Sequence, residues 1–247
     1  MKTSISDYDD YKNFCQQAAT DDETFRRFRQ SSVYTAILEH VSVDIGKSYI
    51  DWIKAASNFT TERLELSKRN DLVGFPSLVD YDEEFSQICP STMRYLKVAL
   101  ELEQLFGSLD GLKIIEIGGG YGGQCKLINE IWKPLSYKLV DLQEPLNLSK
   151  RYIGENDTVV YSVIDELEVD QYDLVISNYA FSECSSNIQQ TYIDKILKNS
   201  KNGYITYNNI CHYYDVDCLS RVEFKQQISC HEMNEVPVTG DNIILYW

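Results

Sequence analysis

Residues 114 to 124, IIEIGGGYGGQ, place five glycines behind an acidic residue at the end of an apolar run. The apolar run, the glycines and the amphipathic stretch that follows predict a tight turn at the carboxyl end of a strand, where α/β sheets bind ligands. Because glycine has no side chain, the backbone of such a turn can approach a ligand closely. Gly118, Gly120 and Gly123 fit the pattern GxGxxG, and Asp141 follows about twenty residues later, where an acid can bind ribose hydroxyls.

Glu116 distinguishes between two kinds of cofactor that suit this pattern. A nicotinamide or flavin dinucleotide would place its pyrophosphate at the start of the following helix, where a nearby carboxylate adds repulsion. S-adenosylmethionine (SAM) has no phosphate, and its amino acid arm carries a sulfonium and an ammonium group that a carboxylate stabilises. Glu116 therefore favours SAM, although the glycine pattern alone is compatible with both cofactors.

The elements that must position these residues differ between the two parts of the chain. In residues 1 to 88 apolar residues recur every three to four positions, as at Val33, Ile37 and Val41, which predicts helices. Pro90 then opens a long helical stretch that Gly107 is expected to close. We expect a helical N-terminal cap over residues 1–88 and a second domain over residues 89–247.

From residue 112 onward, short apolar runs rich in β-branched residues alternate with helical stretches, which is typical of a parallel sheet covered by helices. The last two runs, FKQQISCHEM and DNIILYW, have no helix between them and predict an antiparallel hairpin at one sheet edge. The sequence therefore predicts an α/β fold with a mostly parallel sheet of seven strands.

Composition argues against several classes of partner. The formal charge of −15 weighs against nucleic acid, because affinity for phosphates comes largely from Lys and Arg. No apolar run approaches the ~18 residues of a membrane span, and the start MKTSISDYDDYK lacks the apolar stretch of a secretory signal. The seven scattered cysteines form no CxxC pair, so we expect free thiols and a cytoplasmic protein.

Several segments of the chain between about residues 88 and 247 resemble the sugar O-methyltransferase family of Rossmann-like class I SAM-dependent methyltransferases. The segments are EIGGGYGGQ (116 to 124), LVDLQEPLNLSKRYI (139 to 153), SNYAFSE (177 to 183), EVPVTGDNIILYW (235 to 247) and, ahead of the first strand, PSTMRYL (90 to 96). SNYAFSE is the most particular of them. Gln143 departs from the family, which often has a proline at this position.

The resemblance implies a SAM site in which Glu116 and the glycines line the methionine arm, and Asp141 binds both ribose hydroxyls. Leu142 and Gln143 would flank the adenine. Asp165, with Glu166, would either reach the adenine amino group or form an exposed helix start. The expected cofactor-binding residues are thus Glu116, Gly118, Gly119, Gly120, Asp141, Leu142, Gln143, Asp165 and Asn178.

Methyl transfer to a hydroxyl requires an aligned acceptor and a group that removes the hydroxyl proton. Glu183 is the first candidate for this base, because partial burial beside Tyr179 and Phe181 would raise its pKa toward neutrality. Its alternative role is to cap the next helix. His212 is the second candidate, since imidazole titrates in the useful range, and Tyr179 is the third catalytic candidate.

The remaining polar residues near these segments suggest acceptor contacts. His212, Asp215 and Asp217 offer a loose group of ligands for Mg²⁺, but we do not favour a metal and assign no metal ligand. Arg94 could contact the acceptor or the cofactor carboxylate, or could be a plain surface arginine. The expected substrate-binding residues are Arg94, Ser182, Tyr207 and Asn209.

The sequence favours a SAM-dependent O-methyltransferase that methylates a hydroxyl of a sugar, in a glycan or a nucleotide-linked sugar. Three alternatives stay open. They are a methyltransferase with a non-sugar small-molecule acceptor, an NAD-dependent oxidoreductase on the same fold, and a non-catalytic domain that binds a partner through its helical segment. Glu116, Asp141 and Glu183 favour an enzyme over the last of these.

Overall fold

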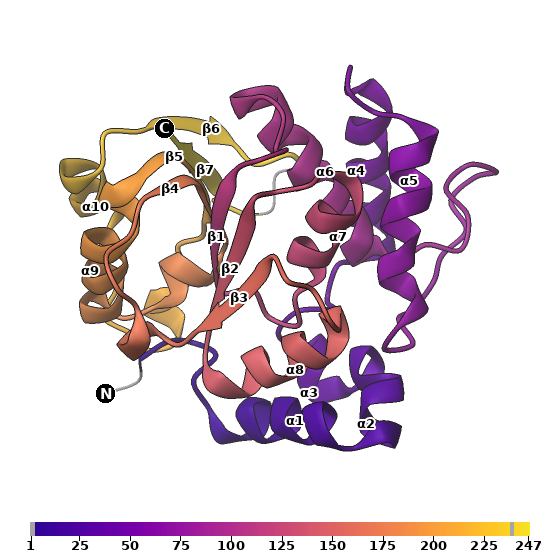
Figure 1. Ribbon diagram of the computed structural model, residues 1–247, viewed down its shortest axis with the longest axis horizontal. Coiled ribbons are helices and arrows are strands. Elements are labelled where there is room, and N and C mark those ends of the chain that lie inside the picture. The colour runs from indigo at the N-terminus through magenta and orange to yellow at the C-terminus, as the bar shows by residue number, and fades with distance from the viewer. Residues whose placement is uncertain (1–2, 238–239) are drawn as a thin grey trace.

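The computed structural model describes residues 3–237 and 240–247, and in this part of the chain seven strands form one sheet (Figure 1). Their order is β3-β2-β1-β4-β5-β7-β6. The strands are β1 (Lys113–Ile117), β2 (Ser136–Val140), β3 (Val159–Ser162), β4 (Tyr172–Asn178), β5 (Ser200–Tyr207), β6 (His231–Asn234) and β7 (Ile243–Tyr246). The first five are parallel, and β7 runs antiparallel to β5 and β6. This arrangement confirms the expected mostly parallel sheet with a C-terminal antiparallel hairpin.

One detail of the expected hairpin is wrong. Phe224 to Gln227 were expected in a strand but lie in helix α10 (Arg221–Gln227), and β6 begins only at His231. The helix forms because Ser220 and Glu223 make a capping box, in which each side chain accepts a hydrogen bond from the other residue's backbone N–H. This local signal outweighs the β-prone residues that follow it.

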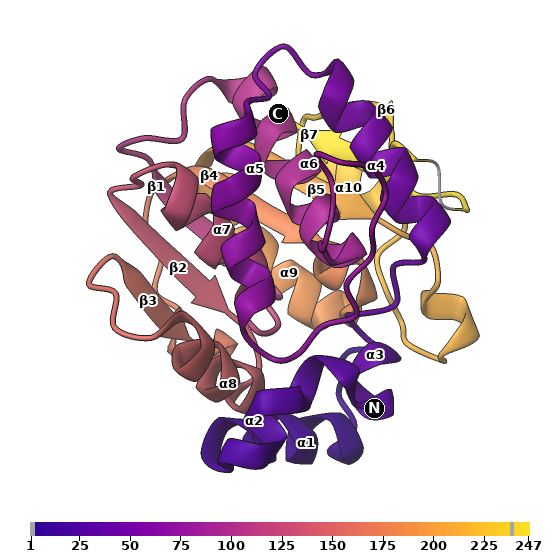
Figure 2. The same ribbon diagram turned by 90° about the vertical axis from the view of Figure 1, so that its right-hand side faces the viewer.

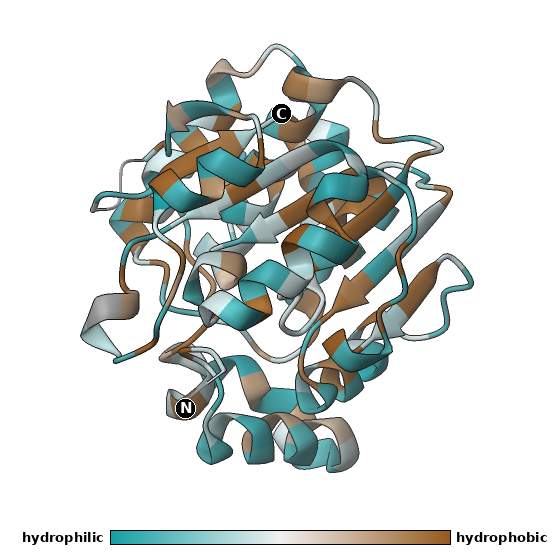
Figure 3. Ribbon diagram, turned by 90° about the vertical axis from the view of Figure 1, so that its left-hand side faces the viewer, coloured by the Kyte–Doolittle hydropathy of each residue, from teal (hydrophilic) through white to brown (hydrophobic). Residues whose placement is uncertain are grey.

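Helices cover both faces of the sheet, because alternate side chains of each strand point to opposite sides. Ile114 belongs to a hydrophobic cluster on one face, and Ile115 to a cluster on the other. Figure 3 shows the apolar strands enclosed by helices with mostly polar outer surfaces. The principal covering helices are α6 (Pro90–Phe106), α7 (Gly123–Ile131) and α8 (Gln143–Ile153) on the first face, with α9 (Ser186–Lys195) and α10 on the second.

The long helix expected after residue 89 is confirmed as α6. It begins at Pro90, whose missing N–H costs nothing in the first turn. It ends before Gly107, which has a φ of 85° that a side chain would disfavour. This helix carries Arg94 and Tyr95 toward the carboxyl edge of the sheet, as the contacts below show.

The N-terminal part is helical, as the apolar rhythm indicates. Its helices are α1 (Asp9–Thr20), α2 (Asp22–Arg27), α3 (Ser32–Thr35), α4 (Val43–Ala55) and α5 (Thr61–Ser67), with 3-10 turns η1 (Phe28–Gln30) and η2 (Lys68–Leu72). Phe28 and Tyr34 share one hydrophobic cluster with Tyr121 and Tyr152 of the second part. Figures 1 and 2 show α1 to α3 beside α8, and α4 and α5 beside α6 and α7.

The cysteines depart from the expectation of free thiols only. Cys211 and Cys218, in the loop after β5, form a disulfide, whereas Cys15, Cys89, Cys125, Cys184 and Cys230 are free. A spacing of seven residues in a loop is no recognised pairing motif, so the sequence did not indicate this contact. Among the residues described, no helix is long and apolar enough to cross a membrane.

Candidate cofactor and acceptor site

The glycine stretch forms the turn between β1 and α7. Gly118, Gly120 and Gly122 have φ angles of 76°, 55° and 86°, a region that residues with side chains rarely adopt. The Gly118 N–H donates to the Val140 carbonyl at 2.8 Å, which fixes the turn against the end of β2. The loop therefore lies at the carboxyl edge of the parallel strands, as expected for a ligand-binding turn.

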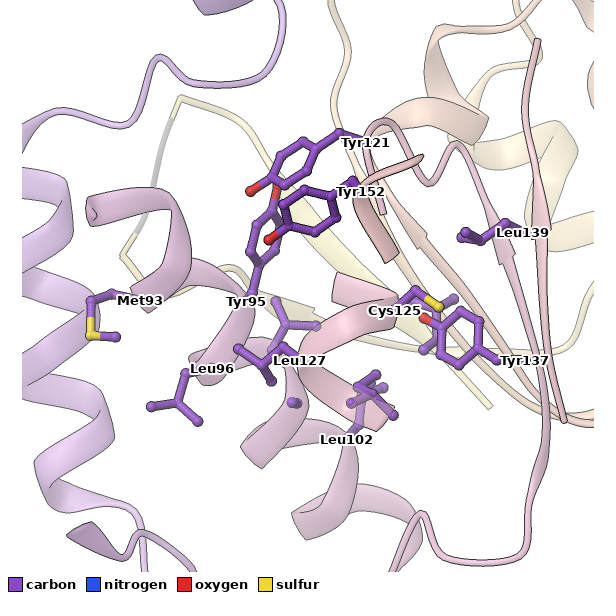
Figure 4. Close-up of a cluster of buried hydrophobic side chains, with 14 of the residues drawn as sticks. Met93, Tyr95, Leu96, Leu102, Tyr121, Cys125, Leu127, Tyr137, Leu139 and Tyr152 are labelled. Atoms are coloured by element: carbon purple, nitrogen blue, oxygen red, sulfur yellow. The ribbon is translucent and has the colours of Figure 1, made fainter. Parts of the chain in front are cut away.

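Other side chains of the protein occupy the space where a Cβ of these glycines would lie. A Cβ on Gly120 would meet Leu38 of the segment between α3 and α4, and a Cβ on Gly118 would meet Ala180. At the start of α7, a Cβ on Gly123 would collide with Tyr95 and Tyr121. Figure 4 shows the rings of Tyr95, Tyr121 and Tyr152 gathered at this point. The start of α7 is thus covered by aromatic side chains.

Asp141 follows β2 at the same edge. Its two carboxylate oxygens accept hydrogen bonds from the backbone N–H groups of Gly120 at 2.9 Å and Leu142 at 2.7 Å. Burial raises the pKa of the Asp141 carboxyl to about 6, although these two bonds lower it. Each oxygen keeps a lone pair for a further donor. The arrangement suits a pair of ligand hydroxyls.

The Glu116 carboxyl lies below the glycine turn and is only 2% exposed. The Tyr137 hydroxyl donates to it at 2.8 Å from the neighbouring strand β2. Burial raises the pKa of Glu116 to about 8, more than the Tyr137 bond lowers it. A nearby cation would favour the ionised Glu116 carboxylate. The expected pairing of Glu116 with the cationic arm of SAM stays a prediction.

Two buried polar atoms near the carboxyl end of β4 have no partner in the described part of the chain. They are Nε of Arg94 on α6 and Oδ1 of Asn178, the last residue of β4. The Arg94 guanidinium lies 5.4 Å from the centre of the Tyr95 ring and 5.8 Å from that of Tyr179. This donor and this acceptor suit a polar ligand that carries both kinds of group. The Tyr34 and Tyr121 hydroxyls and Gln124 Oε1 are likewise buried without a partner among the described residues.

The ends of β4 and β5 bring Glu183 to Asn208. The Asn208 amide donates to Glu183 at 2.6 Å, and Asn208 is itself held by the Ser182 hydroxyl at 2.9 Å. Burial raises the pKa of Glu183, as expected, while the Asn208 bond opposes the shift. The sequence places Asn208 beside Asn209 in the segment after the fifth strand, near the expected methyl position, but indicates no role for it; the structure shows it bound to Glu183.

Other expected site residues take different positions. The Tyr207 hydroxyl donates to the Leu219 carbonyl at 2.6 Å, and the Tyr179 hydroxyl donates to Glu235. Asn209 and Asp165 are exposed. Gln143, also exposed, donates to Asn147 at 2.9 Å within α8.

The Ser182 hydroxyl shares its one proton between the Tyr179 carbonyl and the Asn208 side-chain oxygen, so this proton is already used within the protein. The side chain of His212 lies outside the described residues, and nothing is assigned to it. Elsewhere, no group of three or more His, Cys, Asp or Glu residues could hold a metal ion in the part of the chain that the structure describes.

No protein-family model and no curated protein matches this sequence. Among solved structures, a protein of Thermoplasma acidophilum is 15% identical with a TM-score of 0.50, covering 74% of this chain and 95% of that one. A candidate RNA methyltransferase from Pyrococcus horikoshii is 13% identical with a TM-score of 0.50, covering 76% and 98%. With the strand order and the antiparallel β7, these likenesses show that the chain has the Rossmann-like fold of class I SAM-dependent methyltransferases.

Proposed function

We propose that this protein binds SAM and transfers its methyl group to a hydroxyl of a sugar, in a glycan or a nucleotide-linked sugar. The observation that carries the cofactor assignment is Asp141, whose two oxygens each accept one backbone N–H at the edge of β2 and each keep a lone pair for one more donor. Vicinal ribose hydroxyls supply two donors at this spacing. Glu116 and the glycine run complete the same edge of the sheet.

The amino acid arm of SAM suits the two unpaired atoms near β4. Its carboxylate can accept from Arg94, and its ammonium can donate to Asn178. A buried guanidinium that forms no ion pair with the described residues gains a partner when a carboxylate binds. Bound SAM would supply an activated methyl group on its sulfonium, while the protein supplies position and charge.

A dinucleotide fits this site less well. Its pyrophosphate requires open backbone N–H groups at the start of α7. In the structure that position is packed with Tyr95 and Tyr121 against Gly123, and with Ile153 against Gly122. The buried Glu116 carboxyl below the turn would add repulsion to a phosphate whenever it is ionised. These contacts favour a cofactor without phosphates.

Glu183 is the proposed base for the acceptor hydroxyl. Burial raises the pKa of its carboxyl, which increases its affinity for a proton, and Asn208 holds one of its oxygens. The other oxygen can accept the hydroxyl proton as the oxygen attacks the methyl group. The sugar acceptor rests on the resemblance of SNYAFSE, the segment that contains Glu183, to sugar O-methyltransferases. The helical N-terminal residues 1–88 would close over the bound cofactor.

Calorimetric titration tests the cofactor assignment directly. S-adenosylhomocysteine (SAH) is expected to bind the wild-type protein, and NAD and NADP are not. Asp141→Ala should weaken SAH binding, whereas Asp157→Ala, which removes an exposed acid ahead of β3, should not. Binding of NAD without binding of SAH would refute the proposal and favour an oxidoreductase.

A further inference from the structure

The first described residues lie along the loop that carries Glu183. Ser4 pairs with Cys184 in an isolated antiparallel bridge. The Ile5 N–H donates to the Glu183 carbonyl at 3.1 Å, and the Ser185 N–H donates to the Thr3 carbonyl at 2.8 Å. Residues 3–8, here called the N-terminal strap, therefore form one side of the loop after β4.

Helix α1 continues from the strap across the proposed cofactor edge. Its Tyr11 ring stacks on Tyr34 at 6.1 Å, and Leu38, four residues after Tyr34, lies against Gly120, whose N–H donates to Asp141. At its far end, α1 is tied to α8, because Asn147 donates to Gln16 at 2.8 Å. Figure 1 shows α1 lying along α8 below the sheet. The helix thus spans from the loop after β4 to the helix after β2.

Tyr8 stands where the strap meets α1. It is the N-cap residue of α1, but its side chain makes no capping hydrogen bond. Its ring is 37% exposed, and that of Tyr214 is 47% exposed. Burial raises the pKa of the Tyr8 hydroxyl, and so do the nearby charges of Tyr214 and Glu183. Because Ile5 of the same strap donates to the Glu183 carbonyl, Tyr8 presents an exposed aromatic ring on the segment that borders the loop of the proposed base.

We propose that Tyr8 is a specificity-determining residue of the acceptor site, where its ring stacks on the apolar face of a sugar held against Glu183. The strap holds Tyr8 in this position only while α1 stays packed against α8, the helix that follows Asp141. This inference rests on the proposed function, because it takes Asp141 and Glu183 as the cofactor and acceptor sides of one site.

The single helix α1 links the two sides of the site mechanically. Twelve residues of α-helix span about 18 Å and move as a unit. In this proposal, admitting a nucleoside to Asp141 displaces α1 and the Leu38 segment from this edge, and the same motion withdraws the strap from the Glu183 loop. The acceptor site is therefore complete only after the cofactor has bound and α1 has closed over it.

A disulfide between strap and loop tests this coupling. Ser4 and Cys184 form the pair between the two flanking hydrogen bonds, a geometry in which Cα atoms are about 4.5 Å apart and within the range of disulfides. Oxidised Ser4→Cys, with its cross-link confirmed by mass spectrometry, is expected to bind SAH about tenfold more slowly than the reduced form, because opening is blocked. The matched control Ser4→Cys/Cys184→Ser should bind SAH at one rate in both redox states.

A failure of Ser4→Cys to cross-link would contradict the strap geometry. Equal SAH association rates in the cross-linked and reduced protein would refute the gating of the cofactor by α1. SAH affinity itself is measured in the same experiment. Loss of all SAH binding, including by the wild type, would therefore refute the proposed function and not merely this inference.

The role of Tyr8 is tested with methyl α-D-glucopyranoside as the probe, by saturation-transfer NMR on the SAH complex. Tyr8→Ala should lower the transferred signal about fivefold, the loss expected for one aromatic contact, while SAH affinity stays unchanged. Tyr8→Phe should retain the signal, because it keeps the ring. Phe75→Ala, which removes a 63% exposed ring from the loop after η2, should also retain it.

Two outcomes of this NMR experiment would overturn the assignment of Tyr8. One is an equal signal in the wild type and Tyr8→Ala, including no signal in either. The other is a wild-type signal that is as strong without SAH as with it, since the acceptor site should be complete only in the closed state. Neither result bears on the cofactor assignment, which is judged separately by the SAH affinity.

Discussion

Replacing Asp141 by asparagine removes a charge while keeping the shape of the side chain. In the wild type, both carboxylate oxygens accept backbone hydrogen bonds, at 2.9 Å from Gly120 and at 2.7 Å from Leu142. Asparagine has only one acceptor oxygen, so its amide group must face one of these two N–H donors. The same amide also cannot accept from the second ribose hydroxyl.

The loss of one hydrogen bond between a hydroxyl and a charged acceptor costs about 1.5–3 kcal/mol of binding free energy. This corresponds to a roughly 10- to 150-fold weaker affinity for SAH. The unliganded protein should be less affected. Although one backbone N–H loses its acceptor, the substitution also removes a charge whose burial raises the carboxyl pKa to about 6.

The same pKa predicts a pH dependence of SAH binding. Ribose hydroxyls donate to the ionised carboxylate, and a proton taken up below pH 6 competes with them. The affinity of the wild type should therefore fall about fourfold between pH 7.5 and pH 5.5, from linkage of one proton. Asp141→Asn has no such group and should lack this fourfold component, leaving only the dependence that Glu116, with its pKa raised to about 8, contributes.

Calorimetric titration with SAH over this pH range, on the wild type, Asp141→Asn and Asp157→Asn, measures both effects. Asp157 is exposed in the turn before β3 and serves as the matched control. An affinity of Asp141→Asn equal to that of the wild type at pH 7.5 would refute the assignment of Asp141 to the ribose. If the SAH affinities of the wild type and Asp141→Asn changed with pH in parallel, ionisation of Asp141 would not be the cause of the pH dependence.

Three further substitutions test other parts of the structure. Glu183→Gln should leave SAH affinity unchanged and lower turnover of a verified acceptor ~10²–10⁴-fold, and near wild-type turnover would exclude Glu183 as the base. Burial raises the Glu116 pKa from 4.5 to about 8, so the folded state holds a proton that unfolding releases, and stability should fall as pH rises through this window. Glu116→Gln keeps an acceptor for Tyr137 and should flatten the fall in melting temperature, whereas an unchanged slope would contradict this cause. Arg29→Met leaves two buried carboxylates, Glu39 and Asp71, without their cation and should destabilise the protein by about 3–5 kcal/mol in chemical denaturation, and a smaller loss would show that they neutralise by protonation.

The regular elements were largely predictable because they follow from local periodicity. Apolar runs such as those of β1 and β4 alternate between two buried faces, and their spacing by helical stretches implies parallel strands. Pro90 and Gly107 act within their own turns, so the bounds of α6 were readable. The wrong strand at Phe224 has the same origin, because Phe224 and Ile228 favour a strand by themselves, whereas the capping box of Ser220 and Glu223 ahead of them starts a helix.

The sequence also indicated which residues follow the strands, but not what they contact. Asp141 and Asn178 were placed at strand ends, and the structure shows them there, while their roles toward a cofactor stay predictions. The sequence did not predict the hydrogen bond from the Tyr207 hydroxyl to the Leu219 carbonyl. It also did not predict the hydrogen bond from Asn208 to Glu183. Side chains in loops have no periodic pattern from which their direction can be derived.

Contacts between distant residues were decided by the tertiary structure alone. Leu38 lies against Gly120, Asn147 donates to Gln16, and the strap pairs with Cys184, although these partners are more than 80 positions apart. Such contacts depend on the path of the whole chain and on how apolar surfaces pack, and a single sequence records neither. The sequence alone determined the sheet and the residues at its edge, because both arise from local patterns of burial and backbone freedom. The packing of α1 against α8 at that edge joins separate elements of the chain, which only the folded structure specifies.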